Sequence, residues 1–191
     1  MLIYLKNQQK NFPVLLETFK RVSVMPYDRT RLVEKVSEIV LTVDRNIEEL
    51  NLQTLFSYKV FPENILIALG QWEIEHRDMQ VGDTIVQQVF IPPIQIFSQK
   101  AVFGVRISEI IDEPQQKGFS YETLEGHIEK GISTFTIEQT NKGLVFKIHT
   151  FSVPGNWFTR LVGPVFAIPY QTYCTQAALK KIKHDVSNRF I

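Results

Sequence analysis

Residues 132–153 read ISTFTIEQTNKGLVFKIHTFSV, and this stretch decides the fold class. Apolar residues alternate with polar ones on both sides of Asn141-Lys142-Gly143, whose residue types favour a tight hairpin turn. A period of two is typical of a strand with one buried face and one exposed face. We therefore predict two antiparallel strands, over residues 132–140 and 144–153.

Three stretches further upstream carry the same signal. β-branched and aromatic residues dominate residues 84–91, 101–111 and 118–124, and short turns separate these stretches. The face of residues 101–111 that we expect to be buried holds Ala101, Phe103, Val105 and Ile107. Strands that recur at this spacing and are joined by short turns predict an antiparallel meander.

Helical periodicity occurs on both sides of the meander. Asp28 is a typical N-cap residue, and the apolar residues after it recur at helical spacing up to Val43. We therefore predict a helix over residues 28–43. A second helix is predicted from Tyr170 to Val186. Its inward side chains are expected to be Tyr173, Ala177, Ala178 and Ile182.

The remaining segments have shorter patterns. Residues 1–17 are predicted to form an appended arm, and residues 18–25 a first strand. Residues 63–70 favour a short helix or loop followed by a strand. From residue 71 the period changes to two, which predicts strand structure there. A further helix is predicted to begin at Asn156.

Composition narrows the classes of protein and partner. The chain has 191 residues, of which 44% are hydrophobic, enough for one domain with a core, with or without an arm. Lys plus Arg number 21 and Asp plus Glu 20, so the charge is nearly balanced. Nucleic-acid-binding domains usually carry an excess of basic residues, and we expect no nucleic-acid partner.

Cysteine usage and hydropathy indicate the compartment. The single cysteine, Cys174, allows no internal disulfide, as is usual in a reducing compartment. The first ten residues, MLIYLKNQQK, turn polar after five and have no signal-peptide core. No stretch approaches the roughly 20 apolar residues that a membrane helix needs. We expect a cytoplasmic protein without an integral membrane segment.

The chain resembles a known family along most of its length. The segments that carry the resemblance are VFGVRISEIIDEP at 102–114, GFSYETLEGHIEKG at 118–131 and FKIHTFSVPGNWFTRLVGP at 146–164. They are similar to motifs of the DUF1990 (UPF0548) family, in the same order and spacing, and the resemblance covers roughly residues 18–186. It implies membership of the helix-grip superfamily, whose members bind lipids, hormones and polyketides or act as cyclases and hydrolases.

The order of the elements agrees with this resemblance. A strand, a helix, several antiparallel strands and a long C-terminal helix predict an α+β fold, with helices packed on one antiparallel sheet. A curved sheet wrapped around the long C-terminal helix would leave a cavity between them, as in the helix-grip plan of Bet v 1 and START-like proteins. We expect an N-terminal arm over residues 1–17 and a helix-grip domain over residues 18–191.

Residues 118–131 admit three interpretations. In the first, the glycines serve turns or close backbone approaches, and the polar side chains satisfy loop backbone groups. In the second, Tyr121 points into a cavity with His127 and Glu129 at its mouth. In the third, His127 and Glu129 are an acid–base pair.

The hypothesis that follows is a pocket for an apolar small molecule or lipid. Its expected ligand-binding residues are Phe103, Val105, Tyr121, Thr123, His127, Glu129 and Trp157. One alternative is an enzyme on the same scaffold, a cyclase, isomerase or hydrolase, with Tyr121, His127 and Glu129 as acid–base groups. The other is an interaction protein with a filled core. The four histidines lack metal-ligand spacing and no phosphate-binding loop is present, so we expect neither metal nor cofactor.

Overall fold

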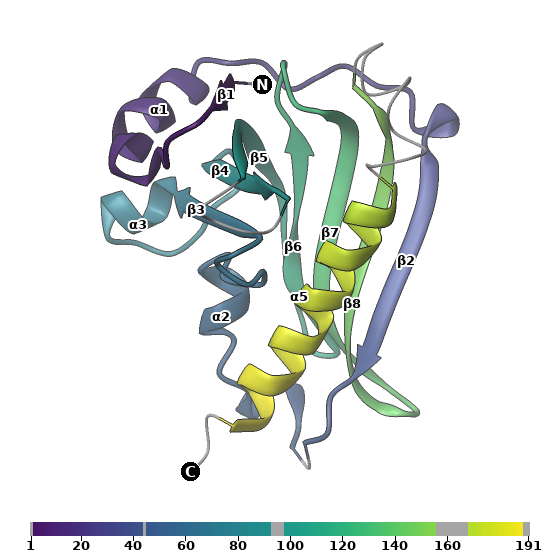
Figure 1. Ribbon diagram of the computed structural model, residues 1–191. Helices are drawn as coiled ribbons and strands as arrows, with labels where there is room; N and C mark the ends of the chain where they lie inside the picture. Colours follow the sequence, from purple (N-terminus) through teal and green to yellow (C-terminus); the bar gives the residue numbers. More distant parts are fainter. Residues whose placement is uncertain (1, 44, 93–97, 156–167, 189–191) are drawn as a thin grey trace.

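An eight-stranded antiparallel sheet forms the body of the protein (Figure 1). The computed structural model describes residues 2–43, 45–92, 98–155 and 168–188. The strands are β1 (Leu2–Tyr4), β2 (Val33–Val40), β3 (Leu66–Gly70), β4 (Thr84–Ile91), β5 (Gln99–Glu113), β6 (Gln116–Thr123), β7 (Glu129–Thr140) and β8 (Gly143–Pro154). Their order is β2-β8-β7-β6-β5-β4-β3, and β1 pairs with the start of β5.

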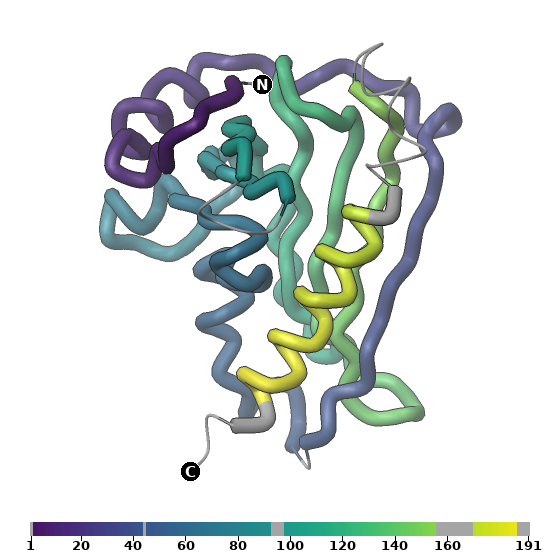
Figure 2. The backbone as a smooth tube through the Cα atoms, in the orientation of Figure 1, coloured from purple at the N-terminus to yellow at the C-terminus, as the bar shows by residue number. Residues whose placement is uncertain are grey.

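The helices are short except for the last. The α-helices are α1 (Phe12–Phe19), α2 (Gln53–Phe56), α3 (Gln71–Glu75) and α5 (Ile168–Asn188), and the 3-10 turns are η1 (Gln9–Asn11), η2 (Arg29–Arg31) and η3 (Ile47–Glu49). Figure 2 shows the yellow trace of α5 running diagonally across the green traces of β6, β7 and β8. No helix in the described part of the chain is long and apolar enough to cross a membrane.

The predicted meander is confirmed. Strands β4 to β8 pair in sequence order, and the β7–β8 hairpin closes at Thr140 opposite Gly143, which has a φ of 99°. Only glycine adopts such a φ without steric cost, which explains the Asn-Lys-Gly turn. A bulge between Ile107 and Glu109 interrupts the pairing of β5 with β6, and bulges of this kind bend strands. The sheet is accordingly curved.

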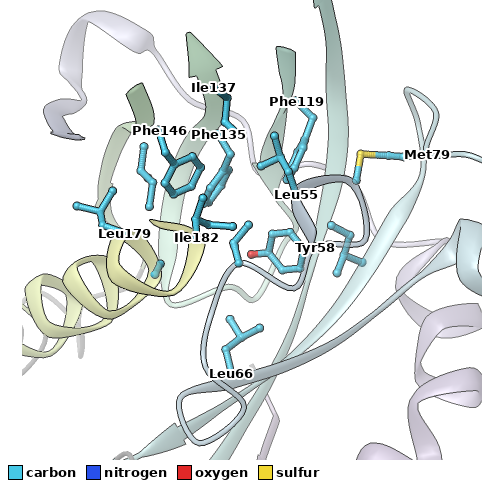
Figure 3. Close-up of a cluster of buried hydrophobic side chains, with 14 of the residues drawn as sticks. Leu55, Tyr58, Leu66, Met79, Phe119, Phe135, Ile137, Phe146, Leu179 and Ile182 are labelled. Atoms are coloured by element: carbon cyan, nitrogen blue, oxygen red, sulfur yellow. The ribbon is translucent and has the colours of Figure 1, made fainter. Parts of the chain in front are cut away.

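The main core fills much of the space between the sheet and α5. Figure 3 shows Phe135 and Phe146 of the sheet near Leu179 and Ile182 of α5. These four side chains are each at most 2% exposed. Burying a side chain of this size contributes about 1.5–3 kcal/mol. The predicted long C-terminal helix on a curved antiparallel sheet is therefore confirmed, although Tyr173, expected to face inward, is 50% exposed.

A second core lies on the opposite face of the sheet. Here α1 packs its apolar side against β3, β4 and β5, which bury their other face in the main core. The buried side chains of this second core are Phe12, Leu16, Phe19, Ile67, Val86, Phe90, Val102 and Leu124. Residues 18–25 were expected to form a strand, but α1 continues through Phe19, and the isolated pair Val24–Leu124 is the one bridge there in the described chain.

The predicted helix over residues 28–43 is wrong. Asp28 does cap a helical turn, since its carboxylate accepts from the Thr30 N–H at 3.0 Å, but that turn is only η2. Residues 33–40 form β2, an edge strand paired with β8. The apolar residues fit helical spacing, yet the hydrogen bonds offered by β8 and the β-branched content of Val33–Val40 favour the strand.

The remaining expectations have mixed outcomes. Residues 71–75, expected as strand, form α3, because the Glu73 carboxylate accepts the Gly70 N–H at 2.9 Å and so caps the helix start. Residues 63–70 were expected to form a short helix or loop followed by a strand. The strand is confirmed over residues 66–70, and a turn precedes it. The helix predicted from Asn156 lies outside the described residues, and the boundary predicted after residue 17 falls inside α1.

Arg106 ties the N-terminal segment to β5. Its Nη2 donates to the carbonyl oxygens of Phe19, Lys20 and Val22 at 3.1, 3.1 and 3.2 Å. Phe19 is the last residue of α1 and Lys20 its C-cap, a place where a helix end favours a cation, and Val22 belongs to the turn that follows. Arg106 therefore caps the helix from another part of the chain.

Replacing Arg106 by Met should lower the free energy of unfolding by about 2–3 kcal/mol, because the carbonyls lose a charged donor. Denaturant unfolding measures this change, and hydrogen exchange should show lost protection in residues 12–22. Arg31→Met is the matched control, since Arg31 is 85% exposed and its ion pair with Asp28 contributes little. Equal stabilities of the two variants would contradict the role given to Arg106.

Candidate functional site

A cavity of about 170 Å³ lies between the sheet and the first turns of α5. The core is filled further along the helix by Leu179 and Ile182, so the hollow is confined to the end where α5 begins. Its lining residues are Lys35, Phe61, Ile65, Leu66, Gln87, Val89, Phe103, Tyr121, His127, Ile128, Glu129, Ser133, Phe135, Ile148, Thr150, Ser152, Tyr170, Gln171, Cys174 and Thr175.

Four of the predicted site residues meet in this lining. Phe103 comes from β5, Tyr121 from β6, His127 from the turn before β7, and Glu129 from the first residue of β7. Two others lie elsewhere. Val105 is buried in the main core, and the Thr123 hydroxyl is bonded to the Gly131 backbone at 3.1 Å to N and 3.3 Å to O. Trp157 lies outside the described residues.

Glycines shape the backbone around these residues. Gly126 has a φ of 86°, which lets the turn after β6 reverse. At Gly131 a Cβ would stand 1.9 Å from the Phe151 carbonyl oxygen, so only glycine permits that approach of β7 to β8. Both glycines therefore serve the backbone, as the first interpretation expected, while their neighbours Tyr121 and Glu129 line the cavity.

Tyr121 belongs to a buried polar network on the cavity floor. Polar side chains of Tyr58, Gln87 and Ser133 surround its hydroxyl and lower its pKa, but burial has the larger effect and raises that pKa. Gln87 also donates from Nε2 to the Tyr58 hydroxyl at 2.9 Å. Ser133 continues the network to Thr150, with 3.2 Å between the hydroxyl oxygens. The network joins β4, β6, β7 and β8 beneath one hollow.

Sequence reasoning missed Tyr58, which holds this network in place. Tyr58 is 2% exposed and has a φ of 54°, a left-handed conformation that costs a bulky residue about 1–3 kcal/mol. Its ring packs edge-on against Tyr121 and Phe135, with centroids 5.9 and 6.1 Å apart. Figure 3 shows its side chain projecting into the cluster from the loop after α2. Strain of this kind persists where surrounding contacts over-determine it.

His127 is a neutral, packed histidine. The centroid of its ring lies 4.1 Å from that of the Phe103 ring, and Nδ1 lies 3.0 Å from both the backbone nitrogen and the carbonyl oxygen of Glu129. Burial lowers the pKa of His127 from 6.5 to about 3. The ring contacts the backbone of Glu129 here, whereas an acid–base pair would have used the carboxylate.

Glu129 is the group that titrates near neutrality. Burial raises the pKa of its carboxyl from 4.5 to about 7, against the opposing effects of a hydrogen bond from Ser152 and the charge of Lys35. A carboxyl group that lines a pocket and has such a pKa is a common feature of functional sites. Lys35 itself donates to the Thr172 hydroxyl at 3.2 Å, so β2 also contacts the helix here.

The α5 side of the cavity offers no activated nucleophile among its described residues. Burial raises the pKa of the Cys174 thiol to about 11, which keeps it protonated. The Tyr170 hydroxyl donates to the Phe90 carbonyl oxygen at 2.5 Å, and burial raises its pKa as well. Tyr170 thus fastens the first turn of α5 to β4. Among the described residues no group of His, Cys, Asp and Glu is placed to hold a metal ion.

A larger hollow elsewhere has a different character. A groove of about 870 Å³ runs between α2, α3 and the β5–β6 hairpin. Its lining residue Trp72 is only 5% exposed, and two of its cations, Lys117 and Arg77, are already paired. Lys117 lies 3.1 Å from Glu48 and 2.6 Å from Asp112, and Arg77 pairs with Asp83. The smaller cavity, with polar groups that converge on one hollow, is therefore the better candidate site.

Comparisons with known proteins agree with the sequence motifs. A family model described as "Domain of unknown function (DUF1990)" matches residues 51–181, a span that includes β3 to β8 and most of α5. A UPF0548 protein of Deinococcus radiodurans is 38% identical over 61 residues. That match spans 31% of this chain and 31% of the relative's length.

Tyr121→Phe should lower the free energy of unfolding by about 1 kcal/mol, because the polar groups of Tyr58, Gln87 and Ser133 would then face a ring edge without a hydroxyl. Denaturant unfolding measures the change. Tyr27→Phe is the matched control for the environment of Tyr58, because it removes a tyrosine hydroxyl away from the cavity. The Tyr27 hydroxyl donates a hydrogen bond to the Glu122 carboxylate at 2.5 Å. If Tyr121→Phe left stability and the environment of Tyr58 unchanged by NMR, the network would not exist in solution.

Glu129→Gln should remove one contribution to the pH dependence of the free energy of unfolding, and the sign of that contribution follows from the raised pKa of Glu129. The folded state binds a proton more tightly than the unfolded state, so the Glu129 carboxyl makes stability fall as pH rises from 4.5 through 7. Unfolding free energies of wild type and variant, compared from pH 4 to 8, should therefore diverge by up to about 3 kcal/mol in favour of the variant at the higher pH. If the unfolding free energies of wild type and variant changed with pH in parallel, the pKa of Glu129 in the folded protein would be an ordinary one.

Proposed function

This chain belongs to the DUF1990 family, and we propose that it binds a small, largely apolar molecule in the cavity between its sheet and α5. One observation carries the proposal: aromatic and aliphatic walls enclose a hollow into which a few polar groups converge. Phe103, Phe135 and Ile148 supply such walls, and Tyr121 and Glu129 supply polar groups. Small-ligand sites are usually built in this way.

The helix-grip assignment is part of the same proposal. A curved antiparallel sheet with a long C-terminal helix laid across it is similar to the helix-grip plan, in which ligands occupy the space between the two. The filled-core alternative is less favoured, because the core closes around Leu179 and Ile182 but leaves the hollow at Tyr170 and Cys174.

An enzymatic role is the second candidate, and Glu129 is the observation that favours it. A carboxyl group with a pKa of about 7 can exchange protons at neutral pH, and Tyr121 lines the same hollow. His127 contributes little to such a role, because with a pKa of about 3 it stays neutral through the physiological range. Binding therefore ranks above catalysis.

The direct test is to identify what the protein retains from its own host. Native mass spectrometry followed by denaturing extraction should find one small apolar compound in the wild type. Thr175→Trp should abolish retention, because Thr175 lines the cavity from α5 and a large ring would fill it. Gln176→Trp is the matched control, since Gln176 is exposed on the same helix and absent from the lining.

Two outcomes would count against the proposal. Equal retention by the two tryptophan variants would place the ligand elsewhere on the protein. A wild type that carries nothing, and whose Thr175→Trp variant unfolds at a higher temperature than the control, would favour the filled-core alternative, because the hollow would then be only a packing defect.

A further inference from the structure

The volume of the cavity limits the size of its occupant. The hollow measures about 170 Å³, close to the roughly 150 Å³ of an apolar protein cavity that admits benzene. Sites for drug-sized molecules span about 300–1,000 Å³. A long acyl chain or a polycyclic hormone therefore exceeds the space, and a single ring fits it.

The walls favour a flat ring. Phe61, Phe103, Tyr121 and Phe135 line the hollow from three strands and the loop after α2. Their mutual contacts are mostly edge-on or tilted, such as the 32° angle between Tyr121 and Phe135. Aromatic side chains that are edge-on to one another leave faces and edges for a further ring.

The floor supplies a place for one oxygen atom. Hydroxyl groups and one amide converge there, from Tyr58, Gln87, Tyr121 and Ser133. Gln87 is 2% exposed, so the polar group of a ligand that reached it would be shielded from water. An apolar molecule at this floor would leave hydroxyl groups facing hydrocarbon, which costs free energy, whereas a hydroxyl or carbonyl oxygen would extend the network.

The charges of the lining favour a neutral occupant. The lining contains one lysine and one glutamate, Lys35 and Glu129. His127 is neutral, and at pH 8, above the Glu129 pKa of about 7, the charges of Lys35 and Glu129 cancel, so the described lining residues then provide no net positive charge to hold a buried carboxylate. Burial of an unpaired anion is costly.

We propose that the cavity takes a neutral single-ring molecule with one hydroxyl or carbonyl oxygen, the ring against Phe103 and Phe135 and the oxygen on the Tyr121 network. Phenols and cyclic alcohols or ketones are the chemical class that meets these conditions. This inference rests on the proposed function, since it names the ligand class of the same site.

Three single-ring compounds of similar size and one long-chain lipid serve as probes that test the proposal. Phenol, toluene and benzoate share a single ring and differ in the group attached to it, and palmitate supplies the long chain. Dissociation constants come from chemical-shift titrations of the wild-type protein at pH 8. Phenol should bind about 2- to 10-fold more tightly than toluene, the range expected of one hydrogen bond. Benzoate should bind at least 10-fold more weakly than phenol, and palmitate should not bind in the cavity.

Variants locate the hydrogen bond. In Tyr121→Phe the preference for phenol over toluene should disappear, whereas Tyr27→Phe should keep it. If Tyr121→Phe proves unstable, the comparison of phenol with toluene on the wild-type protein still tests the proposal, because it needs no variant.

The contrary results separate this inference from the proposed function. The ligand class would be overturned if toluene bound as tightly as phenol or more tightly, if benzoate bound more tightly than phenol, or if palmitate alone bound. Each of these results would leave a binding pocket in place. No binding of any probe in the cavity, together with an empty protein from the host, would overturn both.

Discussion

Strand β5 is the constraint on which the rest of the structure depends, because both of its faces are buried. Phe103 and Val105 face the main core under α5, and Val102 on the alternate face belongs to the core under α1. Gly104 lets this second layer come close, since a Cβ there would stand 2.9 Å from the side chains of Phe19 and Leu124. The same strand pairs with β4, β6 and β1, so the N-terminal segment and the cavity share one support.

The sheet and the last helix could be predicted from the sequence because their patterns are local. Alternation along β5 to β8 and the Asn-Lys-Gly turn depend only on neighbouring residues, and they predicted the meander. Strand β2 could not be predicted in this way. Its sequence VEKVSEIV suits helical spacing equally well, and it is the pairing with β8, more than 100 residues later, that makes it a strand. Likewise, α3 depends on one capping carboxylate that the alternation of Trp72 and Ile74 concealed.

The candidate site was predicted in part. Phe103, Tyr121, His127 and Glu129 were found because a recognisable motif and a strand pattern pointed to them. Tyr58 lies in a stretch without clear periodicity, and only the fold brings it to Tyr121. Gln87 did leave a signal, since two adjacent glutamines interrupt the apolar strand TIVQQVFI. The two turn to opposite faces: Gln87 joins the cavity network, and Gln88 accepts the Gln8 N–H at 2.7 Å and so holds the N-terminal segment.

The neighbours His127 and Glu129 have a joint consequence for the whole molecule. Burial shifts the His127 pKa from 6.5 to about 3, so that residue makes stability rise with pH between those values. Burial shifts the Glu129 pKa from 4.5 to about 7, with the opposite slope. From pH 4.5 to 6.5 the two proton linkages oppose each other, and their sum is nearly flat. Each of the two residues is costly to bury on its own, but their pH dependences offset each other. Across mild acidification the pair leaves the stability of the fold almost unchanged, while the charge of a carboxyl group that lines the cavity changes.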